Sequence, residues 1–525
     1  MSWDQVLPLL VLLSSFVPGL IIFMISEPYR RWRVFLNLSG AVLKVLLVGI
    51  MSLGVAQGRS YALHLPLLPG IDFALEADSL AMLLVVLSSV LWLVTTIYAV
   101  GYLEHSRHRR RFFGFFSICV TATVGVAMAG NLVTFLLFYE LLTLSTYPLV
   151  VHRGTQVARR AGRIYLAYTL TGGTVLFGAI VWLYVLAGTT EFAPRGFVAA
   201  LPESAHGSLV AIFVLLVAGV GVKAALVPLH GWLPHAMVAP APVSALLHAV
   251  AVVKAGVFGI VRIVQNVYGV EFSLELGVTR PLALVAAVTI VYGSLRALFQ
   301  DDLKRRLAFS TVSQVSYIVL GTAVVGPLAT VGGLVHLVHQ GLMKITLFFC
   351  AGNLAETLGI HNVSEMNGVG HRMPWTMGAF AVGALGMIGL PPLVGFISKW
   401  YLGLGALEVG EVWVVYVLVA SGLLNGAYFL PILYAAWFRE PPGQWPSEQA
   451  RLGAPRPPAR GQAPAAVSTV PPTRDSLRPG LETTWWLLAP PLVTAALTLL
   501  LGLLASAPFS PLGWVQFVAG LVFEP

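Results

Sequence analysis

The chain has 525 residues, of which 57% are hydrophobic and only 10% are charged. Ordinary soluble domains carry about 25% charged residues, so this composition excludes a water-soluble globule and predicts an integral membrane protein. The two cysteines, Cys119 and Cys350, lie in apolar runs and cannot by themselves form a haem, iron–sulfur or zinc framework. We therefore expect no cofactor and no metal.

Apolar runs of about 20 residues, the length that crosses a hydrocarbon core, follow one another along the chain. Fourteen of them are predicted to span the membrane: 6–25, 34–55, 79–103, 112–129, 132–151, 164–187, 209–233, 243–264, 281–299, 307–325, 328–351, 375–404, 412–438 and 485–506. Each run must satisfy its backbone groups internally, and the period-two alternation of a barrel is missing. The predicted fold class is all-α, with about fourteen transmembrane helices.

The basic residues are distributed unevenly between the loops of this topology. Taking alternate loops, 22 Lys and Arg residues fall on one side and three, Arg59, Arg195 and Arg280, on the other. Basic residues accumulate on the cytoplasmic side of membrane proteins. We therefore expect an inner (plasma) membrane protein with cytoplasmic basic loops and both termini outside. The net charge of +9 is then a topology signal, and no nucleic-acid partner is expected.

The span pattern divides the chain into five segments. They are an N-terminal three-helix segment (1–111), two five-helix segments (112–265 and 281–438), a linker (439–484) and a C-terminal span (485–525). The linker has ten prolines between Glu440 and Glu482, mixed with Arg, Ala, Gly and Ser. This composition predicts a flexible or polyproline tether on the cytoplasmic side.

Several ionisable residues lie inside the apolar runs, where each charge costs roughly 2.5 to 3.5 kcal/mol on insertion scales. They are Glu140, Lys223, Lys254, Lys344 and Lys399, with His230, His248, His336 and His339 close by in sequence. Stability alone would be better served by leucine, so this row predicts a proton relay rather than structural ion pairs. Lys44, in the second run, fits no part of the relay, and snorkelling to the headgroups is an equal alternative for it.

Two proline-containing segments look like copies of each other. Aligning Pro228 with Pro392 matches Leu229 with Leu393 and Gly231 with Gly395, at an offset of 164 residues. In the same alignment His235 faces Lys399. An odd number of crossings separates the copies, so they point in opposite directions. Inverted repeats with interrupted helices are typical of ion-coupled transporters.

The same segments resemble a known family. The motifs are 223–237 (KAALVPLHGWLPHAM), 239–248, 253–258, 301–316, 336–344 and 389–399. Together they resemble the antiporter-like membrane subunits shared by respiratory complex I and Mrp-type cation/proton antiporters. The resemblance covers the third to thirteenth spans.

This resemblance implies two inverted five-helix bundles, spans four to eight and nine to thirteen, each forming a half-channel around a broken helix. It also implies that Glu140 pairs with Lys223, that Lys254 is the lysine of the eighth span and that Lys399 is the ionisable residue of the twelfth. The implied partners are other membrane subunits, the lipid bilayer and protons; whether sodium is carried as well is left open.

Three functions are compatible with these features. The first is a proton-translocating subunit of an Mrp-type antiporter, similar to its D-type subunit, which the run 139–147 (YELLTLSTY) and the Pro/Arg linker resemble. The end of the chain after its fourteenth span is shared by the D-type subunit and the two smaller complex I homologues, and it disfavours only the largest complex I subunit. The second is the membrane arm of a complex I-like NADH:quinone oxidoreductase or a related hydrogenase, whose redox chemistry sits in other chains. The third is a structural or solute-uptake partner. In none of them is the chain an enzyme on its own.

Overall fold

A computed structural model describes residues 2–104, 106–451 and 482–523. Twelve of its helices are long and apolar enough to cross a membrane. The predicted all-α membrane fold is confirmed, while the count of fourteen spans stays a prediction. The predicted span 307–325 corresponds to the more polar α13 (Leu303–Ala323), and 375–404 corresponds to two shorter helices. Most of the predicted linker lies outside the described residues.

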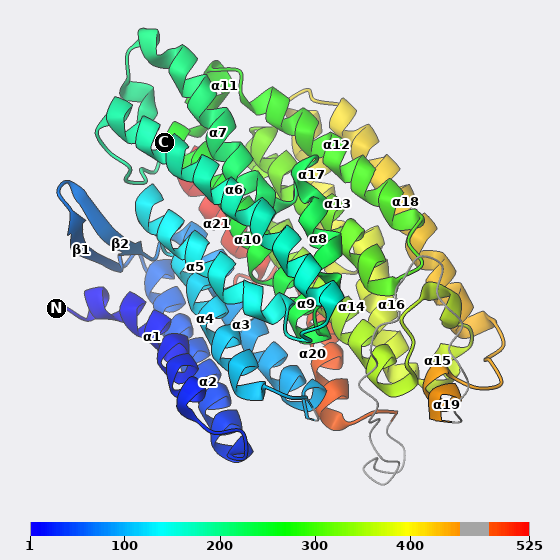
Figure 1. The fold of residues 1–525 in the computed structure, drawn as a ribbon. Coiled ribbons are helices and arrows are strands. Elements are labelled where there is room, and N and C mark those ends of the chain that lie inside the picture. Colours follow the sequence, from blue (N-terminus) through cyan, green and yellow to red (C-terminus); the bar gives the residue numbers. More distant parts are fainter. Residues whose placement is uncertain (1, 105, 452–481, 524–525) are drawn as a thin grey trace.

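Helices make up most of the described chain, and they run side by side in a slanted bundle (Figure 1). The first half contains α1 (Trp3–Met24), α2 (Arg30–Ala56), α3 (Ser79–Tyr102), α4 (Arg109–Ala127), α5 (Leu132–Val150), α6 (Gln156–Ala187), α7 (His206–Ala224), α8 (Trp232–His235), α9 (Ala241–Ala249), α10 (Val252–Arg262) and α11 (Val270–Glu275). The second half contains α12 (Thr279–Leu298), α13, α14 (Pro327–Leu358), α15 (Val369–Arg372), α16 (Pro374–Ile388), α17 (Val394–Glu408), α18 (Trp413–Phe438), α19 (Pro446–Arg451), α20 (Trp485–Leu503) and α21 (Pro511–Phe523).

A β-hairpin that the sequence did not predict follows α2. Strand β1 (Ala62–Leu68) pairs antiparallel with β2 (Ile71–Glu76), from Ala62 opposite Glu76 to Leu68 opposite Ile71. It lies at the end of the bundle where α1 begins (Figure 1). The hairpin was missed for two reasons. Its strands are shorter than those of a membrane-spanning barrel, and the apolar residues of β1 are hard to distinguish in sequence from the long apolar runs on either side.

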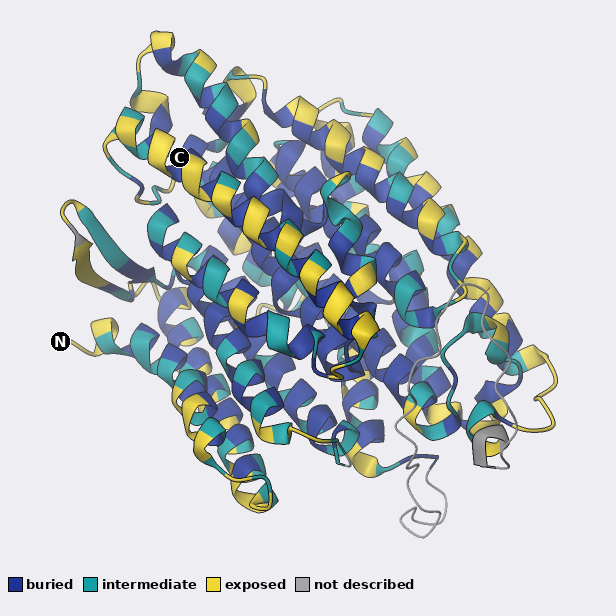
Figure 2. Cartoon of the chain, in the orientation of Figure 1, coloured by how far each residue is buried: buried dark blue, intermediate teal, exposed yellow. Residues whose placement is uncertain are grey.

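The long helix α14 is the centre of the bundle. It packs against α13, α17, α9, α16 and α20, and most of its residues are buried. Every residue of α9 and α10 is buried. By contrast, α6, α12 and α18 show alternating exposed and buried stripes along their length (Figure 2). This pattern is that of helices with one face on lipid and one on protein, so the ionisable residues of α10 and α14 lie in the protein interior.

Both predicted helix interruptions are present. The helix α7 ends at Ala224 and α-helical structure resumes at Trp232 after a 3-10 turn at Leu229–Gly231, while α16 ends at Ile388 and α17 starts at Val394. The region predicted as one continuous span at 243–264 is also divided. There α9 ends at Ala249 and α10 starts at Val252, because Ala251 leaves the helical region of backbone conformation. Interrupted helices leave carbonyl groups without helical partners, and these groups become part of the site.

Candidate functional site

Lys223 lies in the last turn of α7, directly before the first interruption, and its side chain is fully buried. Its ammonium donates a hydrogen bond to the backbone carbonyl of Tyr139 and lies 3.3 Å from the centre of the Tyr139 ring. Glu140 is the next residue of α5. The ion pairs within 4 Å found in the described part of the chain do not include Glu140 with Lys223. Their direct pairing stays a prediction.

Two glycines set the positions of these groups. A Cβ atom at Gly256 of α10 would overlap the backbone of Lys223 and Ala224, so the absence of a side chain lets α10 pack directly on the end of α7. A Cβ atom at Gly173 of α6 would overlap the Oε1 atom of Glu140. The carboxylate therefore occupies space that only glycine leaves free.

Lys254 is fully buried on α10 and donates a 2.8 Å hydrogen bond to the carbonyl of Leu337 on α14. The preceding residue, His336, has its Nδ1 atom 2.7 Å from the hydroxyl of Ser398 on α17. Three separate helices therefore meet at this point. Lys254 and His336, predicted from two different spans, are adjacent in the structure.

Lys399 follows Ser398 and turns back to the end of α16. Its ammonium donates 2.8 Å hydrogen bonds to the carbonyls of Met387 and Ile388, the last two residues of that helix. A cation is stabilised at a helix C-terminus by the unpaired carbonyl groups and the helix dipole. Lys223 lies directly before one helix break and Lys399 follows the other, so both lysines belong to interrupted helices.

The ring of Tyr317 links Lys399 to His336. It stacks on His336 with ring centres 5.1 Å apart, and the Lys399 ammonium lies 5.5 Å from the centre of the same ring. Lys254, His336, Tyr317, Ser398 and Lys399 therefore form one continuous group, here called the central cluster. The sequence did not predict Tyr317 and Ser398, because neither side chain carries a charge that would stand out in an apolar run.

Lys344 and His248 form a neighbouring branch. Lys344 donates to the carbonyl of Leu307 at 3.1 Å and to the hydroxyl of Ser310 at 2.5 Å, both on α13. The His248 ring lies 4.6 Å from that of Phe348, one turn after Lys344 on α14. His248 is fully buried, and neither of its ring nitrogens has a hydrogen-bond partner in the described chain.

The two remaining predicted histidines differ in their surroundings. His339 is buried on α14, one turn after His336. His230 is only half-buried in the first interruption, with its ring 4.9 Å from that of Tyr292. His230 is therefore placed at the edge of the bundle, apart from the central cluster. The fully buried Gln340, next to His339, has no partner for either amide atom among the described residues.

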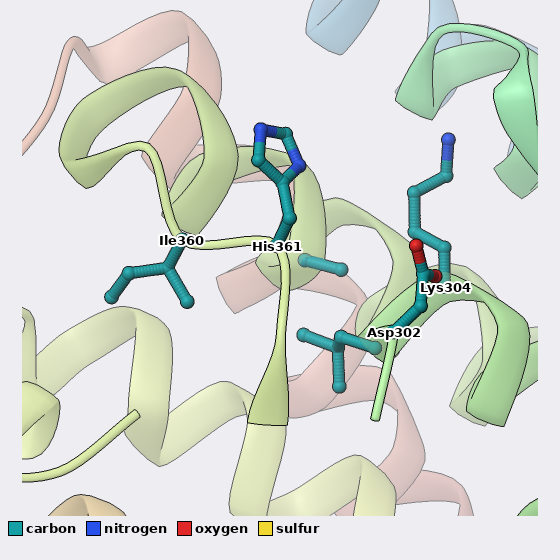
Figure 3. Close-up of a pocket in the computed structure, with 6 residues that line it drawn as sticks. Asp302, Lys304, Ile360 and His361 are labelled. Atoms are coloured by element: carbon teal, nitrogen blue, oxygen red, sulfur yellow. The ribbon is translucent and has the colours of Figure 1, made fainter. Parts of the chain in front are cut away.

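A small surface pocket has none of these groups in its lining (Figure 3). It is lined by Asp302, Leu303, Lys304, Ala351, Ile360 and His361. Asp302 accepts a hydrogen bond from the backbone of Arg305 and caps the start of α13. The Lys304 ammonium donates to the carbonyl of Ala239 at 2.5 Å. Asp302 and Lys304 therefore have structural roles, as the cap of α13 and as a contact between α13 and the segment before α9.

A helical membrane bundle with buried lysines at interrupted helices is the architecture of ion-coupled membrane transport proteins. The family model described as "NADH:quinone oxidoreductase/Mrp antiporter, TM" matches residues 129–424. The chain belongs to this family, as the resemblance predicted. A second model, for the N-terminus of complex I chain 5, matches residues 69–113.

Individual relatives come from both branches of the family. NADH-quinone oxidoreductase subunit N of Desulforudis audaxviator is 35% identical over 94% of this chain and 95% of its own length. The D-type Na(+)/H(+) antiporter subunit of Alkalihalophilus pseudofirmus is 28% identical over 82% of this chain and 87% of its own. Among solved structures, a chain of the Mrp complex from Dietzia sp. DQ12-45-1b matches with a TM-score of 0.84 and 23% identity, over 100% of this chain and 98% of that one. The structural likeness supports the fold.

Proposed function

We propose that this chain is a proton-translocating, antiporter-type membrane subunit. The residues that would carry the proton are Glu140, Lys223, Lys254, Lys344 and Lys399, assisted by His230, His248, His336 and His339. The observation that carries this proposal is shared by the four lysines: each ammonium is held by neutral oxygen atoms of the protein. A neutral oxygen holds an ammonium less strongly than a carboxylate does, which favours release of the proton.

Internal water would join the groups. Buried polar atoms without a protein partner are costly unless ordered water satisfies them. His248 and Gln340 have such atoms beside the lysines of the second half of the bundle. Water at these positions would connect the Lys344 branch to the central cluster, where Lys254 bonds to the residue after His336 and Lys399 lies over the Tyr317 ring that stacks on His336.

The direction of transfer would be set at the first interruption. With Glu140 ionised, its charge favours the protonated form of Lys223. A conformational change that moves the carboxylate away removes this attraction, and the proton passes through histidines and water towards Lys254 and then Lys344 or Lys399. A change of 1.36 kcal/mol shifts a proton equilibrium tenfold, so a modest movement is sufficient to switch the direction.

The test is transport by variants of the expressed complex in inverted membrane vesicles. We expect Lys223→Ala and Glu140→Ala to lose most proton-coupled transport while reaching the membrane at the level of the unsubstituted chain. Sodium-driven and potassium-driven proton movement are measured separately, which decides whether sodium is carried. Wild-type transport by both variants would show that the proposed relay is wrong.

Two assemblies fit this role. We propose an Mrp-type antiporter complex in which the chain takes the place of the D-type subunit, a role supported by the 28% identity to such a protein over 87% of its length. The second candidate is the membrane arm of a quinone oxidoreductase, favoured by the 35% identity to a subunit N over 95% of its length. Purification of the tagged chain distinguishes the two, because small antiporter subunits accompany the first and iron–sulfur and flavin subunits the second.

A further inference from the structure

Lys44 is a buried cation outside the proposed relay. It lies at the middle of α2, a helix of 27 residues, and its side chain is fully buried. This position excludes snorkelling, because a snorkelling lysine keeps its ammonium in water or among headgroups. In the described part of the chain the ammonium has no hydrogen-bond partner, and its neighbouring aromatic ring is that of Trp92, at 5.5 Å.

A stripe of unpaired polar groups on α3 includes Trp92. Ser88, Trp92 and Thr96 are spaced four residues apart and therefore lie on one face of the helix. All three are fully buried, and the Ser88 hydroxyl, the Trp92 indole nitrogen and the Thr96 hydroxyl lack partners within the described residues. Their neighbours Ser89 and Thr95 donate instead to helix carbonyls, at 2.7 and 2.6 Å. The unpaired atoms are thus confined to the face that carries Trp92.

Polar groups continue from Lys44 along the buried face of α2 towards its first turn. Ser117 of α4 donates a 3.0 Å hydrogen bond to the side-chain oxygen of Asn37, whose amide nitrogen has no partner in the described chain. Arg33 follows one turn closer to the helix start and is 1% exposed. At 1.5 Å of rise per residue, Lys44 lies about 16 Å deeper than Arg33.

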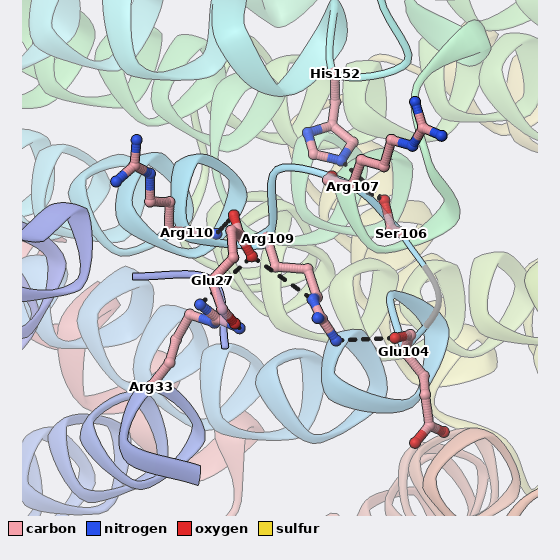
Figure 4. A network of polar contacts seen from close by, with 8 residues as sticks. All are labelled: Glu27, Arg33, Glu104, Ser106, Arg107, Arg109, Arg110 and His152. Atoms are coloured by element: carbon pink, nitrogen blue, oxygen red, sulfur yellow. Dashed lines mark hydrogen bonds and ion pairs between the residues drawn. The ribbon is translucent and has the colours of Figure 1, made fainter. Parts of the chain in front are cut away.

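At the Arg33 end of this row, a network of charged residues lies between the ends of the first four helices (Figure 4). Arg33 lies 3.6 Å from the carboxylate of Glu27, which also accepts a 3.0 Å hydrogen bond from the backbone of Arg110 and lies 3.8 Å from Arg109. Glu27 is 38% exposed. The row of polar groups therefore begins at a solvated carboxylate and ends at the Lys44 amine.

The titratable groups of the helices packed against α2 face elsewhere. They are Asp4 at the start of α1, Tyr98 and Tyr102 of α3, Cys119 of α4 and the arginines that begin α4. Tyr98 donates to the carbonyl of Phe349 on α14 and stacks on Tyr102, and Cys119 contacts Thr146 of α5. None of these contacts is directed at the Lys44 amine.

We propose that Lys44, Ser88, Trp92 and Thr96 form a hydrated proton-binding site in the N-terminal helices, reached from the Arg33 end of α2 and separate from the relay. Buried polar atoms of this kind require water, and the amine is the proton acceptor among them. A hydronium ion gives its proton to the neutral amine, which leaves a water molecule and an ammonium above the Trp92 ring. The ammonium is stabilised there by its interaction with the ring.

The test uses fluorine NMR of the full chain in lipid nanodiscs, with 5-fluorotryptophan at the 13 tryptophan positions. The Trp92 signal is assigned by its loss in Trp92→Phe. We expect this signal to move through one titration step with pH, because the charge beside the ring changes, and to shift between H2O and D2O, because water reaches it. In Lys44→Met the titration step disappears.

Each result has a defined meaning. A Trp92 signal that keeps one position at every pH, or that does not respond to D2O, overturns the proposal, and so does a titration that persists in Lys44→Met. The two wild-type measurements remain decisive if Lys44→Met does not fold. Lys223→Met, which should stop transport, is expected to leave the Trp92 titration in place, so failure of the relay and failure of this site are distinguished.

Discussion

The space beside Glu140 provides a sharp test of how the first interruption works. Gly173→Ala adds a single methyl group where the Oε1 atom of Glu140 now lies, so the carboxylate must move. Gly178→Ala is the matched control, because it lies on the same helix and a Cβ atom there meets nothing within 4 Å. Both substitutions replace a helical glycine by alanine and differ in the contact with Glu140.

The expected sizes follow from this geometry. Alanine in a helix is favoured over glycine by about 1 kcal/mol, so Gly178→Ala should raise the melting temperature. In Gly173→Ala that gain is offset by about 0.5–1.5 kcal/mol for a displaced side chain, which leaves stability close to that of the wild type. For two unit charges about 5 Å apart, a retreat of about 2 Å weakens their attraction by about 1 kcal/mol at an effective dielectric constant of about 20. This corresponds to about a fivefold fall in transport.

Thermal unfolding in detergent and transport in inverted vesicles measure the two effects separately. We expect Gly173→Ala to fold normally and transport about five times more slowly, while Gly178→Ala transports at the wild-type rate. If a folded Gly173→Ala chain transports as well as the wild type, the position of the Glu140 carboxylate does not control transfer. The reasoning also fails if Gly178→Ala loses as much transport as Gly173→Ala.

Three further predictions concern other contacts. Burial, with Arg111 as the largest neighbouring charge, lowers the pKa of His152 from 6.5 to about 4. The unfolded chain therefore binds this proton first, and as the pH falls from about 6.5 to 4 the protein should lose up to about 3 kcal/mol of stability. Unfolding measured at several pH values should show a smaller loss in His152→Gln. Arg262→Met removes two hydrogen bonds to Asp78, of 2.6 and 2.8 Å, and should lower the free energy of unfolding by about 2 kcal/mol. An unchanged denaturant midpoint in chemical unfolding would contradict this. Ser398→Ala removes the partner of His336 and should slow transport with a stability loss of about 1 kcal/mol, and Ser398→Thr should restore the rate.

The sequence was informative about what is local. The lengths of the apolar runs predict membrane helices because an isolated backbone in lipid must form its own hydrogen bonds. Pro228 and Pro392 indicate the two interruptions because proline removes a helix donor and distorts the turn before it. The same local reasoning missed the hairpin, and it missed the division between α9 and α10 because Ala249, Val250 and Ala251 carry no turn signal.

The partners of the ionisable residues could not be predicted in this way. Lys399 lies 11 residues after Ile388 in sequence, yet its ammonium caps the helix that Ile388 ends, and Lys254 bonds to a residue 83 positions away. Such contacts depend on how α10, α14, α16 and α17 pack. Tyr317 and Ser398 are ordinary residues in sequence and join the central cluster only through that packing.

The sequence by itself determined that the chain is a helical membrane protein, where the two proline-containing interruptions lie, and which charges are placed in apolar runs, because hydropathy, proline and charge act within one segment. The tertiary structure decided which of those charges meet. It brought Lys254, His336 and Lys399 together, placed His230 at the edge and enclosed Lys44 among unpaired polar groups of α3. The physical reason is that lipid makes each helix form alone, whereas the surroundings of a buried charge come from the faces of neighbouring helices.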